Sequence, residues 1–404
     1  MKTSIVSLLL ACFLSSYAQD YSVLTTARLE LNNVLAISDT ASRRHALDKW
    51  WNDLREAKHI PLVAEDSVLF LYRGEAGSVV WMGDFNGWGY NKAFENNGKR
   101  IPGTDVWKLR CVFPKDARLD YKIFINQTTW VLDHENPHHQ WSGVGGGSPN
   151  SELRMPLWIE DPIQHVRPGG PHGTVRKDIL FASKILGYQI MYNVYLPAGH
   201  ENHTKLPVIY VTDGFEYMLP ELGNMITVLD NLIADKKIKP IIAVFLDQRE
   251  PINRSNNKRM EELGMNEKYL KFFTEEFIPS VEVKYPILRN VADRAILGSS
   301  MGGLTSAYFA FARPDLFGMA GMQSPAFWMR PQIYALCDKA SGPKLKVSLT
   351  SGLINDASEG SRKMRDILQN NSCVYHYREN NEGHSWGNWR NLIDDILIDF
   401  FGKE

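Results

Sequence analysis

The stretch 295–303, with the sequence AILGSSMGG, constrains the possible fold more than any other part of the chain. An apolar run leads directly into Gly298-x-Ser300-x-Gly302, and a helical pattern follows from 301 to about 312. This combination predicts a sharp strand-to-helix turn with the hydroxyl of Ser300 exposed at its tip. Side chains at 298 and 302 would collide with neighbouring backbone in so tight a turn, which explains the glycines. A purely structural glycine-rich turn is the alternative interpretation.

The rest of the C-terminal part alternates between strand and helix patterns. Such alternation predicts an α/β domain with a mostly parallel sheet and helices on both faces, and we place it at residues 161–404. The expected strands are 189–196, 208–211, 241–246, 294–297, 346–350 and 373–377, and the expected helices lie around 222–235, 265–284, 301–312, 358–370 and 388–401.

The N-terminal part has a different pattern. Residues 19–60 have helical spacing, whereas residues 61–160 contain short alternating stretches at 67–72, 78–82, 106–113 and 119–125 that are broken by Gly, Asn and Asp. Such strands predict a small all-β sandwich. Prolines 156, 162, 168 and 171, together with Gly169 and Gly170, indicate a linker that ends near Gly173. Two domains also suit a chain of 404 residues, because single cores stop growing at roughly 250–300 residues.

Residues 1–18 have the pattern of a signal peptide. Lys2 precedes an apolar run from 5 to 14, and the small-residue site at 16–18 ends in Ala18. The run is too short for a membrane anchor, which needs about 20 apolar residues. We therefore expect a secreted or periplasmic protein whose mature chain is not inserted in a membrane. Lipoprotein anchoring at Cys12 is a second possibility.

Charge and cysteine content exclude some classes of protein. The chain has 45 basic and 46 acidic residues, a net charge of −1, so no basic field exists that would attract nucleic acid. Cys111, Cys337 and Cys373 remain after the leader is removed, and this odd, widely spaced set predicts no disulfide framework. A single bond between Cys337 and Cys373 is possible in an oxidising compartment. The oligomeric state stays open.

A serine hydroxyl needs a base within hydrogen-bond reach to act as a nucleophile. In the α/β-hydrolase order an acid and then a histidine follow the serine. His384 lies in a glycine-containing loop between the last expected strand and the last helix, and is our candidate base. His376 is the other histidine after Ser300, but it lies inside the strand pattern.

The acid is expected in the loop after the strand 346–350. Asp356 is our first candidate, because it would orient His384 and stabilise the imidazolium. Glu359 is three residues further on and would serve if the loop runs differently. Asp366 lies in a helical pattern and is a weaker choice.

An oxyanion hole requires two N–H donors. One is expected from the backbone of Met301, directly after Ser300, and the other from the loop after an early strand. Gly214 and Phe215 follow the strand 208–211, so the backbone N–H of Phe215 is the second candidate and Gly214 is expected to touch the substrate. An ordinary Asp-Gly turn is the alternative interpretation.

The segments LGSSMGG at 297–303, VTDG at 211–214 and GHSWGNWR at 383–390 together resemble the esterase family that includes esterase D, the enterochelin esterases and the feruloyl esterases of carbohydrate esterase family one. The resemblance spans about residues 172–402. It implies an α/β-hydrolase catalytic domain in which Trp328 and Trp386 are expected to line the acyl or sugar pocket. A buried core position is the alternative for either tryptophan. The segments 259–263 and 323–328 also resemble recurring parts of the family and are interpreted as pocket-shaping.

The segment VWMGDFNGW at 80–88 looks like part of the immunoglobulin-like early-set domain that precedes the catalytic domain of enterochelin esterases and glycan-active enzymes. Such a domain would bind glycan or only buttress the active site, and we favour the buttress. His134, His138 and His139 lie in a loop without recognisable ligand spacing, so we predict neither a metal nor an organic cofactor.

These features predict a serine carboxylic ester hydrolase that works through an acyl-enzyme. An exported enzyme of this kind is expected to act on feruloyl or acetyl esters of carbohydrates. Hydrolysis of a ferric siderophore ester is the alternative. An acyltransferase or binding protein on the same scaffold is a second alternative, because fold does not fix function.

Overall fold

The computed structural model describes residues 23–143, 148–339, 345–371 and 373–403. The expected signal peptide and Cys12 lie outside these residues. The chain divides into two compact units. The first holds the described residues up to Ile159 together with Asn381–Gly383, and the second holds Glu160–Asn380 and the residues from His384 onwards.

Two helices begin the first unit. Residues 23–35 are helical, and α2 spans Thr40–Glu56 after a cap in which Asp39 accepts a hydrogen bond from the Ser42 N–H at 2.7 Å. The two helices share an apolar core with strand residues of the same unit, and Trp50 Nε1 donates to the Ala27 carbonyl at 3.1 Å.

The rest of the first unit is built from two antiparallel sheets. One has the strand order β1-β2-β5-β4, and the other has the order β3-β6-β9-β8, with β7 paired to β6. Aromatic side chains such as Phe70 and Trp81 are buried in this unit and lie 6.0 Å apart between ring centroids. The strands are β1 (Leu62–Ala64), β2 (Ser67–Arg73), β3 (Val79–Gly83), β4 (Lys99–Arg100), β5 (Val106–Val112), β6 (Arg118–Ile125), β7 (Thr129–Val131), β8 (His139–Trp141) and β9 (Pro149–Arg154).

The second unit contains one eight-stranded sheet with the order β10-β11-β13-β12-β14-β15-β16-β17. Six neighbouring strands run parallel to one another, namely β13, β12, β14, β15, β16 and β17. The strands β10 and β11 are antiparallel additions at one edge. The prediction of a mostly parallel sheet is therefore confirmed. The strands are β10 (Thr174–Ala182), β11 (Gln189–Leu196), β12 (Val208–Val211), β13 (Ile242–Asp247), β14 (Arg294–Ser299), β15 (Met319–Gln323), β16 (Lys346–Gly352) and β17 (Val374–Asn380).

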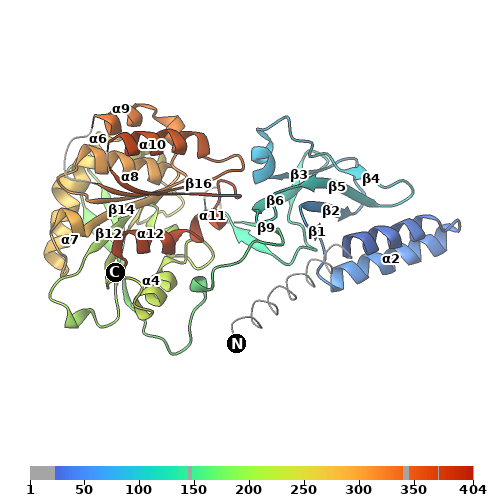
Figure 1. The fold of residues 1–404 in the computed structure, drawn as a ribbon, viewed down its shortest axis with the longest axis horizontal. Helices are drawn as coiled ribbons and strands as arrows, with labels where there is room; N and C mark the ends of the chain where they lie inside the picture. The colour runs from blue at the N-terminus through green and yellow to red at the C-terminus, as the bar shows by residue number, and fades with distance from the viewer. Residues whose placement is uncertain (1–22, 144–147, 340–344, 372, 404) are drawn as a thin grey trace, which may run out of the picture. The chain divides into compact units, whose positions relative to one another are not determined.

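Helices cover both faces of this sheet, as predicted. Successive side chains of β14 enter different cores, with Ile296 in one cluster and Leu297 in the other. In Figure 1, α8, α9 and α10 lie on one side of the sheet and α4 and α12 on the other. The helices are α3 (Gly214–Met218), α4 (Met225–Ala234), α5 (Arg259–Glu262), α6 (Glu267–Phe272), α7 (Ile278–Lys284), α8 (Met301–Ala312), α9 (Gln332–Asp338), α10 (Ser358–Asn370), α11 (Trp386–Arg390) and α12 (Ile393–Phe401).

Some elements differ from the sequence prediction. The helix expected at 265–284 is divided into α6 and α7 by a π-helical stretch at Phe273–Phe277, and the helix expected at 388–401 is divided into α11 and α12. The strands β10 and β15 and the helix α9 were not predicted. Within the described residues, no helix is long and apolar enough to cross a bilayer.

Candidate active site

The turn between β14 and α8 holds Ser300 in an unusual backbone conformation, with φ 55° and ψ −116°. A non-glycine residue with positive φ is strained unless its surroundings hold it there. The glycines on either side remove the clashes that would forbid the turn. A Cβ at Gly298 would lie 2.3 Å from Thr212 Oγ1 and 2.4 Å from the carbonyl carbon of Gly302. The segment therefore has the geometry expected of a nucleophile elbow.

The three side chains proposed from the sequence as a triad lie within hydrogen-bond distance of one another. His384 Nε2 is 2.9 Å from Ser300 Oγ, and His384 Nδ1 is 2.5 Å from Asp356 Oδ1. The Asp356 side chain is fully buried and the imidazole is partly exposed. Such an arrangement lets the imidazole take a proton from the serine hydroxyl while the carboxylate orients the ring.

The other candidate residues lie elsewhere. Glu359 is in the first turn of α10, and Asp366 pairs with its neighbour Arg365 on the same helix. His376 lies on β17 and is 3.4 Å from Asp399. The structure therefore favours Asp356 among the candidate acids and His384 among the histidines.

Sequence reasoning missed the residues that hold Asp356. Ser324 Oγ donates to Asp356 Oδ2 at 2.5 Å, and the Gly352 N–H donates to the same oxygen at 2.6 Å. Trp389 Nε1 in turn donates to Ser324 Oγ at 2.9 Å. With Oδ2 occupied by these donors, Oδ1 is left to face the imidazole. Ser324 lies in the segment 323–328, which the sequence predicts to shape the pocket, and it also contacts the acid.

The two candidate oxyanion donors follow the carboxyl ends of two neighbouring strands. The parallel strands β12 and β14 pair Val211 with Leu297, so the turns that follow them are neighbours. Met301 is the first residue of α8 and Phe215 is the second residue of α3. First-turn N–H groups have no partner inside their own helix, so both are available to an anion.

Arg259 links these two turns. Its guanidinium donates to both carboxylate oxygens of Asp213 at 2.9 Å and to the Ser299 carbonyl at 3.3 Å. Asp213 precedes Gly214, and Ser299 precedes the candidate nucleophile. A buried charge must be paired to be tolerated, and here the pairing fixes two backbone segments at once. Sequence reasoning had noted the segment 259–263 only as pocket-shaping.

The two tryptophans expected beside the substrate have different environments. Trp328 is 59% exposed, and its ring centroid lies 5.7 Å from that of His384. Trp386 is only 2% exposed and donates from Nε1 to Glu216 Oε2 at 2.7 Å. The expectation for Trp386 is therefore wrong, because the indole is a core residue. Gly214 is also buried, and an added Cβ there would lie 2.5 to 2.6 Å from Phe245, so this residue does not lie on a surface that a substrate could touch.

Two buried carboxyls, Glu216 and Glu262, lie on the short helices α3 and α5. Burial, with Asp213 nearby, raises the pKa of Glu216 to about 7. Burial also raises the pKa of Glu262 to about 8, and its Oε2 atom has no hydrogen-bond partner among the described residues. Neither carboxyl belongs to the triad.

The cysteines and the histidines of one loop are the remaining candidates from the sequence. Cys111, Cys337 and Cys373 are free thiols, so the bond considered between Cys337 and Cys373 is not formed. In the described part of the chain, no three His, Cys, Asp or Glu side chains are grouped as metal ligands, and this holds for the loop with His134, His138 and His139.

An eight-stranded, mostly parallel sheet with a serine elbow after β14, an acid after β16 and a histidine after β17 defines an α/β-hydrolase. Residues 183–400, more than half of the chain, match the family model described as "Putative esterase". The chain belongs to this esterase family.

The relatives of the chain include a protein named as a feruloyl esterase and proteins named as iron(III) enterobactin esterases. The chain is 31% identical over 172 residues to an endo-1,4-beta-xylanase/feruloyl esterase of Xylanibacter ruminicola, a match of 40% of this chain and 23% of that protein. It is 24% identical over 257 residues to an iron(III) enterobactin esterase of Escherichia coli, covering 57% of this chain and 60% of that protein.

Among solved structures, the chain resembles ferric enterobactin esterase from Salmonella typhimurium, with a TM-score of 0.68 and 19% identity over 83% of this chain and 93% of that one. At this identity the likeness shows the fold alone. The family and the sequence relatives together make the chain a carboxylic ester hydrolase.

Proposed function

We propose that the chain is an exported serine esterase in which Ser300 is the nucleophile, His384 the general base and Asp356 the orienting acid. His384 Nε2 takes the Ser300 proton as Oγ attacks the ester carbonyl, and the N–H groups of Met301 and Phe215 stabilise the oxyanion. The imidazolium then donates that proton to the departing alcohol. Water, deprotonated by the same imidazole, hydrolyses the acyl-enzyme and restores Ser300.

One observation carries this proposal. The chain Ser300 Oγ, His384 Nε2 and Nδ1, Asp356 Oδ1 is continuous, with distances of 2.9 and 2.5 Å, and it begins at the strained tip of an elbow. A nucleophile within hydrogen-bond reach of a base, with the base oriented by a third group, is the geometry that serine catalysis requires. Export rests on the pattern of residues 1–18.

For the substrate we favour a feruloyl or acetyl ester of a carbohydrate. The exposed indole of Trp328 beside His384 offers a flat apolar surface on which an aromatic acyl group can stack. The sequence relative from Xylanibacter ruminicola is named as a feruloyl esterase. In the same proposal the two sheets of the first unit form an immunoglobulin-like early-set domain. This domain has a supporting role for the active site and does not bind glycan.

A ferric siderophore ester is the second candidate substrate. The match to ferric enterobactin esterase covers 83% of this chain, so the likeness in fold extends well beyond residues 183–400. A named enterobactin esterase is also a sequence relative. This candidate keeps the same triad and changes only the acyl group and the alcohol.

The test is hydrolysis of methyl ferulate, acetylated xylan, p-nitrophenyl acetate and a ferric catecholate triester by the chain lacking residues 1–18. Ser300→Ala should lower kcat by several orders of magnitude on every substrate that the wild type cleaves. Ser306→Ala is the matched control, because this buried serine of α8 donates to the Gly302 carbonyl and lies outside the triad.

Preference for the ferulate or the acetylated xylan is the expected result. Preference for the catecholate would move the assignment to siderophore hydrolysis. Near-normal turnover by Ser300→Ala would contradict the proposed mechanism for every substrate.

A further inference from the structure

The three residues before His384 do not belong to the unit that contains the rest of the triad. The chain leaves the second unit at Asn380, the end of β17, and Asn381–Gly383 belong to the first unit. His384 is again part of the second unit. The proposed base is thus joined directly to a short segment that the first unit holds.

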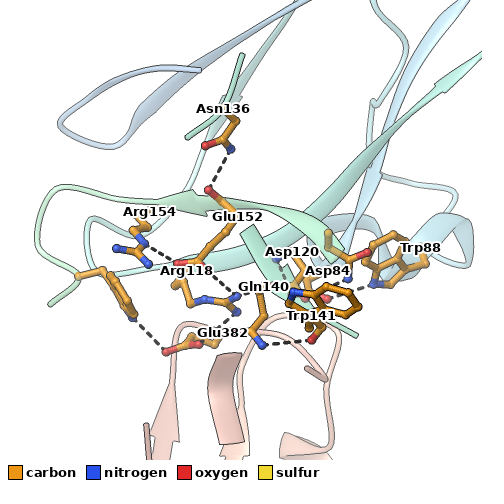
Figure 2. Close-up of polar contacts among 12 residues, drawn as sticks. Asp84, Trp88, Arg118, Asp120, Asn136, Gln140, Trp141, Glu152, Arg154 and Glu382 are labelled. Atoms are coloured by element: carbon orange, nitrogen blue, oxygen red, sulfur yellow. Dashed lines mark hydrogen bonds and ion pairs between the residues drawn. The ribbon is translucent and has the colours of Figure 1, made fainter. Parts of the chain in front are cut away.

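Glu382, in the middle of this segment, is 3% exposed, and its carboxylate accepts one hydrogen bond and forms one longer ion pair. Arg118 Nη1 lies 3.8 Å from Glu382 Oε2, and Trp158 Nε1 donates to Glu382 Oε1 at 3.3 Å. The backbone is held as well, because the Arg118 N–H donates to the Asn381 carbonyl at 3.3 Å and Arg118 forms a parallel bridge with Glu382. Figure 2 shows Glu382 beside the Arg118 guanidinium.

Arg118 itself is rigidly held. It is 1% exposed, and its Nη2 atom donates to Asp120 at 2.6 Å and to Glu152 at 3.2 Å. Glu152 also pairs with Arg154 (Figure 2). A buried arginine with several carboxylates has little rotational freedom, so Glu382 meets a fixed partner.

The residue next to His384 is also restricted. A Cβ at Gly383 would lie 2.3 to 2.6 Å from the side-chain atoms of Asp84, so only glycine fits there. Asp84 is held in place by the N–H of Asp120 at 2.9 Å and by Trp88 Nε1 at 3.1 Å. The backbone is therefore constrained at all three positions that precede the imidazole.

We propose that Glu382, held by Arg118 and Trp158, is a positioning residue that fixes where the chain presents His384 to Ser300. The inference rests on the proposed function, and the effect passes through the chain that joins Glu382 to His384. Few soft dihedral angles separate Glu382 from the His384 ring, so releasing Glu382 lets the imidazole leave the position from which it reaches the serine.

The test compares Glu382→Ala with Glu152→Ala. Each removes one buried carboxylate from Arg118 and leaves two, so both variants are expected to fold with similar losses of stability. Glu382→Ala should lower kcat on the order of 10- to 100-fold with KM little changed, because misplacement by about 1 Å can cost 100-fold. Glu152→Ala should lower kcat much less than Glu382→Ala, because Asp120 still holds the Arg118 guanidinium and the contacts of Glu382 remain. Glu382→Gln, which still accepts from Trp158, should recover most of the loss.

A spectroscopic readout separates this inference from the proposed function. The proton between His384 Nδ1 and Asp356 Oδ1 should give a low-field NMR signal that Glu382→Ala weakens and Glu152→Ala retains. If Ser300→Ala keeps the activity, the proposed function fails, while the NMR comparison still tests the positioning.

Equal kcat and equal low-field signals in the two alanine variants would overturn the inference. If Glu382→Ala does not fold, Gly383→Ala replaces it, because the added Cβ displaces the same segment against Asp84. That variant should show both a weaker low-field signal and a lower kcat. If the signal and kcat both stay at the wild-type level, the inference is overturned.

Discussion

Ser324 illustrates how much of the site depends on single residues that no motif identifies. It follows β15, has a positive φ of 40° and donates to the oxygen of Asp356 that faces away from His384. Sequence order alone was enough to propose Ser300 and His384, since the elbow and the last loop are readable patterns. It left Asp356 and Glu359 both open, because the path of a loop depends on such side-chain contacts rather than on periodicity.

We predict that Ser324→Ala lowers kcat/KM about tenfold, because Asp356 loses a donor that orients its carboxylate toward the imidazole. Ser348→Ala is the matched control. Ser348 is buried on the adjacent β16 and donates to Asp399 at 2.7 Å, in a hydrogen bond remote from the triad. Steady-state kinetics with both variants measure the difference, and equal losses would show that Ser324 has only a structural role.

At the scale of elements, helices with strong periodicity or clear boundaries were predicted accurately. The helices expected at 301–312 and 358–370 coincide with α8 and α10. The strand β15 was missed because its sequence, MAGMQ, lacks β-branched and aromatic residues. Its Gly321 packs tightly against Leu297 and Ile396, so tertiary packing rather than local propensity makes this segment a strand.

The sharp turn between β14 and α8 can be tested by replacing its first glycine. Gly298→Ala should abolish activity and destabilise the second unit by about 1–3 kcal/mol or more, because the new methyl group meets Thr212 Oγ1 and the backbone of Gly302. Gly77→Ala, where the nearest atom lies 3.5 Å away, is the control. Thermal unfolding and esterase assays on both variants give the comparison, and a stable, active Gly298→Ala would contradict the proposed geometry.

For the whole molecule, the sequence indicates a β-rich part followed by an α/β part, and the structure divides into two compact units with the first boundary in the chain between Ile159 and Glu160. The return of Asn381–Gly383 to the first unit was not predicted, because nothing in three residues of local sequence reveals a long-range partner such as Arg118. Buried carboxyls were not predicted either, since burial is a property of the folded chain.

Those carboxyls make stability depend on pH. Burial raises the pKa of Glu262 to about 8, above the value of about 4.3 in an unfolded chain. The folded state therefore binds the proton more tightly, so this stabilisation is complete below about pH 4.3 and is lost as the pH rises through about 8. The slope for one proton reaches about 1.4 kcal/mol per pH unit at most.

We therefore expect Glu262→Gln to be more stable than the wild type at pH 8 and to show a flatter pH dependence between pH 5 and 8. The amide can still accept from the Tyr188 hydroxyl, which is 2.8 Å from Glu262 Oε1. Glu261→Gln, at an exposed neighbouring position, is the control. Denaturant unfolding across this pH range would refute the account if both variants followed the wild-type slope.

The most direct test of the central claim is labelling by a fluorophosphonate, which reacts with a serine hydroxyl only when a base activates it. The wild type should be labelled on Ser300, and His384→Ala should be labelled far more slowly, because the hydroxyl then lacks the base 2.9 Å away. Peptide mapping by mass spectrometry identifies the modified residue. Absence of label, or label that persists in Ser300→Ala, would contradict the assignment of Ser300 as the nucleophile.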